Sequence, residues 1–217
     1  MTSKAIVLLS GGQDSTTVLY WAKEKFSEVI ALTFDYGQRH RIELEAARKV
    51  AEIAQVKQIV LTIDTFAQIG QNALLDNSIK VEHKSGELPS TFVPGRNLIF
   101  LTYAAAQAYI LGITDLVVGV CQTDFSGYPD CRDNTIKSLN ESINLGMEKE
   151  FVIHTPLMFL TKKQTVDMAV QYNALEAMKY SHTCYEGTYP PCGVCPACLL
   201  RAKGFEQAGI KDPIFLR

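Results

Sequence analysis

The sequence lacks the features that mark several classes of protein. Its 217 residues include 21 lysines and arginines against 23 aspartates and glutamates, so there is no basic excess to hold nucleic acid by bulk electrostatics. The most apolar stretch, residues 98–113, is interrupted by Thr102, Gln107 and Gly112 and predicts a buried helix. The opening MTSKAIVLLSGG reaches glycine too early for a secretory signal peptide. We therefore expect a cytoplasmic protein with no nucleic-acid partner and no membrane partner.

Apolar runs alternate with helical patterns along most of the chain. Residues 4–9 (KAIVLL) form a near-continuous apolar run, which is typical of a strand buried on both faces of a parallel sheet. The alternation that follows predicts a doubly wound, mostly parallel α/β sheet. Residues 70–95 lack a clear period and predict a long loop or a small insertion. Further strands are predicted at 28–34, 57–63, 115–120 and 151–154, and helices from about residue 14 and at 41–54, 98–111, 134–147, 161–172 and from 199.

A loop rich in glycine and hydroxyl groups ends the first apolar run. It reads SGGQDS (residues 10–15) and opens a helix, where backbone N–H groups and the positive end of the helix dipole favour phosphate. Its two glycines allow the backbone to approach an anion closely, and Asp14 could orient the loop or hold magnesium. The loop has neither the lysine of a Walker A motif nor the G-x-G-x-x-G spacing. A plain strand-to-helix turn with a serine or aspartate cap is the alternative interpretation.

Three other segments are predicted at strand ends or helix starts, namely residues 35–40, 86–97 and 123–133. Ligands of open α/β sheets lie outside the carboxyl ends of strands, so these segments should face the glycine loop. Their aromatic rings can sandwich a heterocycle, their carboxylates can accept the N–H donors of a guanine-like edge, and their arginines can bind carboxylate or phosphate. Local turn and cap bonds are the alternative role for each residue. The candidate substrate residues are Phe92, Arg96, Asn97, Asp124, Phe125, Tyr128, Asp130, Arg132 and Asp133.

Four of the six cysteines crowd together near the C-terminus: Cys184, Cys192, Cys195 and Cys198. C-x-x-C turns let sulfur atoms converge on one metal ion, and without a secretory signal a metal site is favoured over a disulfide framework. We predict a structural zinc site, with an iron–sulfur cluster as the alternative. The chain is divided accordingly into a nucleotide-binding α/β domain, residues 1–180, and a small zinc-binding subdomain, residues 181–217. Ordering of residues 180–183 by the metal site is a further hypothesis.

These motifs together resemble a known enzyme family. The SGGQDS loop is similar to the S-G-G-x-D-[ST] loop of the PP-loop ATP pyrophosphatases, which have an adenine nucleotide alpha hydrolase-like fold. VPGRN (93–97), TDFSGYPDCR (123–132) and the four-cysteine end resemble the 7-cyano-7-deazaguanine synthase family of the queuosine pathway over essentially the whole chain. The resemblance implies that 7-carboxy-7-deazaguanine, ammonia and ATP become the nitrile through an adenylated acid and an adenylated amide, releasing AMP and pyrophosphate. It also implies zinc at the cysteines and a homodimer.

The resemblance also implies an ATP site. TPL (155–157) followed by Thr161 and Lys162 is similar to a late PP-loop segment whose lysine reaches the ATP phosphates, although an exposed lysine in a first helical turn is the alternative. Magnesium is expected to accompany ATP. Asp14, Ser15 and Lys162 are the predicted catalytic residues. The predicted ATP-binding residues are Ser10, Gly11, Gly12, Gln13, Asp14, Ser15, Thr16, Thr17 and Lys162.

Two rival functions remain open at this point. A PP-loop tRNA thiolase would use Cys121 or Cys131 in sulfur transfer and would show a basic surface or an RNA-binding extension. The alternative interpretation is that these two cysteines pack as small apolar groups, which is the commonest role of cysteine. A non-catalytic zinc-ribbon module would bind nucleic acid or protein, and it would leave the SGGQDS loop unexplained.

Overall fold

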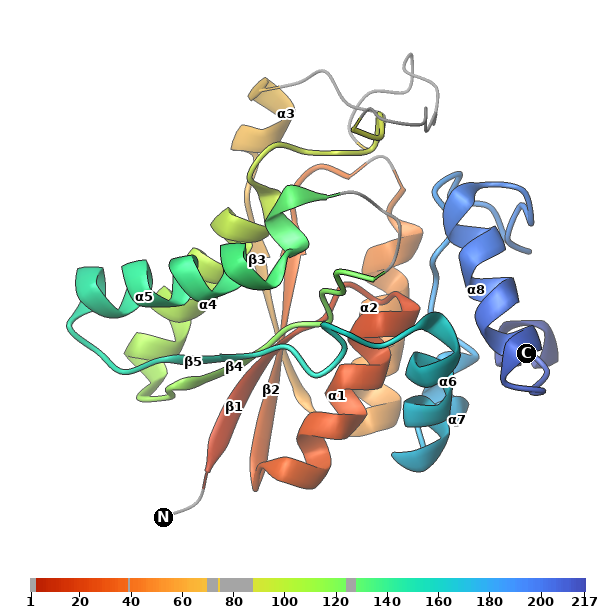
Figure 1. The fold of residues 1–217 in the computed structure, drawn as a ribbon, viewed down its shortest axis with the longest axis horizontal. Helices are drawn as coiled ribbons and strands as arrows, with labels where there is room; N and C mark the ends of the chain where they lie inside the picture. The colour runs from red at the N-terminus through yellow and green to blue at the C-terminus, as the bar shows by residue number, and fades with distance from the viewer. Residues whose placement is uncertain (1–2, 39, 70–73, 75–87, 124–127) are drawn as a thin grey trace.

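A single parallel sheet forms the centre of the fold in the computed structural model, which describes residues 3–38, 40–69, 74, 88–123 and 128–217 (Figure 1). In these ranges the strand order is β3-β2-β1-β4-β5, and every neighbouring pair is parallel. The order therefore reverses between β1 and β4, which confirms the doubly wound α/β sheet. The strands are β1 (Lys4–Leu8), β2 (Glu28–Asp35), β3 (Lys57–Thr62), β4 (Asp115–Val117) and β5 (Val152–His154).

Helices cover both faces of the sheet, because successive strand residues point to opposite sides. Ala5 and Val7 of β1 pack with the helices of one face, whereas Ile6 and Leu8 pack with those of the other. The first face carries α1 (Gln13–Lys25), α2 (Ile42–Ala54) and α7 (Leu175–Met178), with α6 (Lys162–Gln171) packed against α1. The second face carries α3 (Thr65–Ile69), α4 (Arg96–Leu111) and α5 (Asp133–Met147).

The C-terminal segment packs beside α6 and α7. Its helix α8 (Pro196–Gln207) lies against α6, and Phe205 shares a small core with Val166 and Met178. Arg201 of α8 is buried; its Nε donates to Asp212 at 2.7 Å and one guanidinium nitrogen donates to Ser181 Oγ at 2.8 Å. The segment is thus tied closely to the rest of the chain, and the boundary after residue 180 stays a prediction. Two short 3-10 helices are η1 (Pro129–Cys131) and η2 (Pro213–Leu216).

The predicted strands and helices are present, with differences at their ends. α4 begins at Arg96 and not at residue 98, because Gly95 turns the chain with a φ of 71° directly before it. α8 begins at Pro196 and not at residue 199, with proline in the first helical turn, where its missing N–H is not needed. β4 is three residues shorter than predicted, and α3 and α7 were not foreseen. In the described part of the chain, no helix has the length and apolarity needed to cross a membrane.

Candidate active site

A cavity of about 290 Å³ opens at the carboxyl ends of β1, β2 and β4. This is the place where the strand order reverses, and ligands of open α/β sheets bind there. The glycine loop forms one side, and aromatic side chains of β2, α4 and three connecting segments contribute to the rest. The residues lining it include Ser10, Gly12, Gln13, Asp14, Ser15, Thr33, Phe34, Tyr36, Glu43, Arg96, Asn97, Phe100, Tyr128, His182 and Tyr185.

The glycine loop is held in one conformation by its neighbours. Gly11 has a φ of 85°, and a Cβ there would lie 2.5 Å from the Ala47 backbone nitrogen of α2, so no larger residue fits. Ser15 Oγ donates to the Gly12 carbonyl oxygen at 3.1 Å, and Ser10 Oγ donates to Ser15 Oγ at 3.1 Å. The loop therefore presents its backbone to the cavity in a preformed shape.

Three polar residues at the start of α1 differ in what they offer a ligand. Thr16 and Thr17 donate their hydroxyl hydrogens back to the Gly12 and Gln13 carbonyl oxygens, at 2.8 and 3.0 Å, and neither lines the cavity. The Gln13 side chain is 2% exposed and lines the cavity, yet neither of its amide atoms has a hydrogen-bond partner in the described structure. A buried amide without partners costs about 1–3 kcal/mol, so a ligand that bonds Gln13 recovers this free energy.

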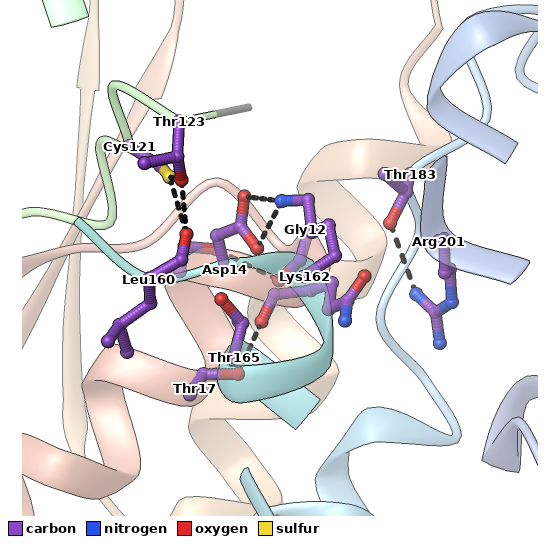
Figure 2. A network of polar contacts seen from close by, with 12 residues as sticks. Gly12, Asp14, Thr17, Cys121, Thr123, Leu160, Lys162, Thr165, Thr183 and Arg201 are labelled. Carbon is purple, nitrogen blue, oxygen red and sulfur yellow. Dashed lines mark hydrogen bonds and ion pairs between the residues drawn. The ribbon is translucent and has the colours of Figure 1, made fainter. Parts of the chain in front are cut away.

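Lys162 and Asp14, two of the predicted catalytic residues, meet across the mouth of the glycine loop (Figure 2). Lys162 Nζ donates to Asp14 Oδ1 at 2.8 Å and to Oδ2 at 2.6 Å. A capping box formed by Thr161 and Gln164 starts α6 at this lysine. On the other side, a Cβ on Gly204 of α8 would lie 3.0 Å from Lys162 Cβ, so α8 fixes the base of the lysine.

The structure brings only some of the predicted substrate residues to the cavity. Arg96, Asn97 and Tyr128 line it, and Arg96 Nη1 donates to Tyr36 Oη at 3.3 Å. Phe92 stands behind Tyr128, with ring centroids 5.7 Å apart.

The remaining predicted residues lie outside the cavity lining. Asp130 is buried and accepts a hydrogen bond from the Asn97 backbone nitrogen at 3.0 Å, so it anchors the first turn of α4. Asp133 pairs with Lys137 at 2.7 Å at the start of α5, and Arg132 is exposed. Asp124 and Phe125 lie outside the described residues. Among the predicted base-reading aspartates that the structure describes, none lines the cavity.

Glu43 is a cavity residue that the sequence did not single out. It stands in the first turn of α2, and its backbone carbonyl is one of the groups that exclude a side chain at Gly11. Burial raises the pKa of its carboxyl to about 7, although the Arg96 guanidinium opposes the rise. No hydrogen bond or ion pair holds this carboxylate in the described structure, so it is an acceptor available to a ligand's N–H or O–H groups.

The raised pKa predicts how stability depends on pH in the ligand-free protein. Between the usual value of 4.5 and about 7 the folded state binds more protons than the unfolded state, so the free energy of unfolding falls as pH rises through this range. Glu43→Gln removes the effect and should stabilise the protein by about 2 kcal/mol at pH 8, with little change at pH 4.5. Thermal unfolding of the variant and of wild type at both pH values measures this effect. An equal stability difference between the two proteins at pH 8 and at pH 4.5 would contradict it. Arg96 and Tyr36 face Glu43, and neither changes its protonation state across this range: Arg96 stays a cation, and Tyr36 stays neutral because burial raises its pKa to about 12.

The four clustered cysteines form a candidate metal site. Their sulfur atoms all lie within 4.8 Å of one another, and those of Cys192 and Cys198 are 3.9 Å apart, close to the separation of about 3.8 Å expected around a tetrahedral ion. Burial alone would raise the pKa of the Cys184 thiol, but backbone N–H groups of Cys192, Glu186 and Thr188 bring it down to about 6, which favours a thiolate ligand. Cys198 lies inside α8, not in a turn as predicted. The cluster could therefore hold one metal ion.

The two remaining cysteines, Cys121 and Cys131, are both buried, as the packing interpretation predicts. Burial and the neighbouring Asp130 raise the pKa of the Cys131 thiol to about 12, whereas a reactive cysteine needs a lowered pKa. Cys121 Sγ donates to the Leu160 carbonyl oxygen at 3.3 Å (Figure 2).

Known proteins similar to this chain point to one family. The family model described as queuosine biosynthesis protein QueC matches residues 4–209. The chain is 60% identical to a 7-cyano-7-deazaguanine synthase of Chromobacterium violaceum, covering 99% of this chain and 94% of the relative. It is 54% identical to one of Bacillus subtilis, covering 94% of both.

Solved structures share the fold at low identity. A 4-thiouridine synthetase in complex with RNA and bound ATP is 15% identical with a TM-score of 0.56, covering 95% of this chain and 50% of that one. A predicted subunit of a tRNA methyltransferase from Methanocaldococcus jannaschii is 20% identical with a TM-score of 0.51, covering 77% of this chain and 74% of that one. These likenesses support the adenine nucleotide alpha hydrolase-like architecture of the sheet and its helices.

Proposed function

Because this chain belongs to the QueC family of queuosine biosynthesis proteins, we propose that its cavity converts 7-carboxy-7-deazaguanine, ammonia and ATP to 7-cyano-7-deazaguanine, AMP and pyrophosphate. The protein is thus an ATP-dependent carbon–nitrogen ligase. The observation that carries the proposal is a preformed glycine loop at the sheet's switch point, with the unpartnered Gln13 amide beside it, in a chain that matches this family over nearly its full length.

The reaction uses two rounds of activation at the glycine loop. A substrate carboxylate oxygen attacks the α-phosphorus of ATP, and pyrophosphate leaves with the electrons of the broken P–O bond. Ammonia then adds to the acyl carbon and loses a proton as AMP departs, which leaves an amide. The amide oxygen attacks a second ATP in the same way, and loss of both protons from nitrogen together with departure of AMP forms the C≡N bond. Each activation turns a poor leaving oxygen into a good one, so the chain supplies mainly position and charge stabilisation.

Residues that line the cavity divide these tasks with Lys162, which lies at the mouth of the glycine loop. Backbone N–H groups of the glycine loop and the Ser10 and Ser15 hydroxyls bind the departing pyrophosphate, where negative charge develops. The Lys162 side chain moves its ammonium group from Asp14 toward the phosphates. Magnesium bound with ATP would neutralise polyphosphate charge, and the freed Asp14 carboxylate would be its ligand. Arg96, Asn97 and Tyr128 hold the deazapurine.

The cysteine cluster is proposed to hold zinc in a structural role. Four sulfur ligands leave no open position for a reacting group, and such closed sites stabilise folds. An iron–sulfur cluster uses the same four ligands, and metal analysis of purified protein separates the two.

We further propose a cytoplasmic homodimer. Six unpaired cysteines and a requirement for ATP suit a reducing compartment. Ile110 of α4 and Leu145 of α5 are 79% and 75% exposed, which gives a second copy apolar side chains to cover. Light scattering should then report twice the chain mass of 24.1 kDa.

One incubation tests the proposed function. Purified protein receives ATP, magnesium, ammonium and 7-carboxy-7-deazaguanine, and mass spectrometry follows the nitrile and AMP. We expect nitrile and AMP without RNA. Formation of AMP only with tRNA and a sulfur donor would indicate a thiolase, and no AMP under either condition would indicate a binding module. ADP as the product would overturn the assignment.

A further inference from the structure

Tyr185 connects the cysteine cluster to the cavity. It follows the metal-ligand candidate Cys184 directly, yet its side chain lines the cavity together with Tyr128 and Arg96. The ring packs against the cysteine cluster and also against the main core cluster that contains Val93. No other residue is shared by these two clusters in the described part of the chain.

The Tyr185 side chain lies with Tyr128 in two respects, since both line the cavity and both pack against the main core cluster. Tyr128 in turn is hydrogen-bonded through its hydroxyl to Thr91 Oγ1 at 2.5 Å, and its ring leans on Phe92. The Tyr185 ring is therefore joined to the two loops that carry the predicted substrate residues.

The segment that carries Tyr185 contacts two other parts of the chain, one before Tyr185 and one after it. The His182 backbone nitrogen donates to the Gly11 carbonyl oxygen of the glycine loop at 2.7 Å. Gly187 packs so closely on His40, just before α2, that a Cβ would lie 2.1 Å from His40 Cγ. Docking before and after Tyr185 leaves its ring little freedom to move.

We propose that Tyr185 is a positioning residue for the heterocyclic substrate, with its ring forming one wall of the substrate cavity and the cysteine cluster holding that wall in place. A planar bicyclic ligand gains most from a rigid aromatic surface, because stacking requires close parallel contact. The inference rests on the proposed function for the identity of the ligand. It adds that the metal-binding segment contributes to substrate affinity as well as to stability.

The test compares Tyr185→Ala, Tyr185→Phe and wild type. Tyr185→Ala should raise the KM for 7-carboxy-7-deazaguanine at least tenfold, whereas the Kd for ATP should stay within twofold and the metal content should remain one ion per chain. Tyr185→Phe keeps the ring and should restore most of the affinity. Tyr189→Phe is the matched control, because Tyr189 lies in the same segment, is 47% exposed and does not line the cavity. Its KM should equal that of wild type.

A second readout does not depend on turnover. If Tyr185 couples the two sites, saturating 7-carboxy-7-deazaguanine should slow removal of the metal by a chromogenic chelator several-fold in wild type and not in Tyr185→Ala, since coupling between two sites is reciprocal. An unchanged KM in Tyr185→Ala, or parallel loss of ATP affinity and metal, would overturn the inference. Wild-type protein that forms no nitrile would overturn the proposed function instead, and protection of the metal by the ligand would still decide the role of Tyr185.

Discussion

Lys162→Ala is expected to lower kcat/KM for ATP by about 10²–10³-fold while the protein remains folded. Removing one group that stabilises charge in the transition state typically has an effect of this size. Lys162 Nζ lies within 2.8 Å of both Asp14 carboxylate oxygens, which places its charge next to the glycine loop that is proposed to bind the phosphates. Lys162→Arg should recover part of the loss, because it keeps the charge but places it differently. Release of pyrophosphate measures the effect.

The neighbouring lysine provides a control for this prediction. Lys163 pairs with Asp167 at 2.7 Å on the exposed side of the same helix turn. Lys163→Ala should therefore leave pyrophosphate release near the wild-type rate. Equal loss of pyrophosphate release in the two variants would show that any positive charge at the start of α6 supports the reaction. That result would contradict the specific role proposed for Lys162.

Cys198→Ser is expected to abolish stoichiometric metal binding and to lower the unfolding temperature by more than 10 °C. Three sulfur ligands hold the ion less tightly than four, and the free energy of metal binding is coupled to folding of the segment that binds it. Cys198 lies in the first turns of α8, and α8 supports Lys162 through Gly204. Activity should consequently fall along with stability.

Metal analysis and thermal unfolding measure this second effect, with Cys121→Ser as the control. Cys121 is also buried, but its sulfur bonds to the Leu160 carbonyl oxygen far from the cluster in sequence. The control should keep one metal ion per chain. Full metal content in Cys198→Ser would contradict a four-sulfur site.

The parts of the site that could be predicted are those whose signal is local in sequence. The glycine loop follows an apolar run and precedes a helix, and the four cysteines lie within one short segment, so both are visible without a fold. Lys162 was predicted from the resemblance of its segment to a late PP-loop segment, and its role stays a prediction. The structure places it against Asp14, 148 positions earlier in the chain.

The residues that were missed have ordinary local surroundings. Glu43 lies in a helix with an amphipathic pattern, where a glutamate in the first turn is expected to face solvent. Tyr185 lies in a cysteine-rich segment, where the sequence pattern predicts tight turns around a metal site and no contact with substrate. Asp130 was predicted to read a base edge, but its buried carboxylate holds the Asn97 backbone nitrogen. Such assignments depend on which helix ends meet above the sheet, and this is decided by long-range packing.

The close contact between Gly204 and Lys162, together with the hydrogen bond from the His182 backbone nitrogen to the Gly11 carbonyl oxygen, has a consequence for shortened variants. Both contacts come from the C-terminal segment, residues 181–217, whereas the glycine loop and Lys162 come earlier in the chain. A variant that lacks residues 181–217 loses both contacts and all four clustered cysteines. We therefore expect such a variant to handle ATP poorly even where its parallel sheet still forms.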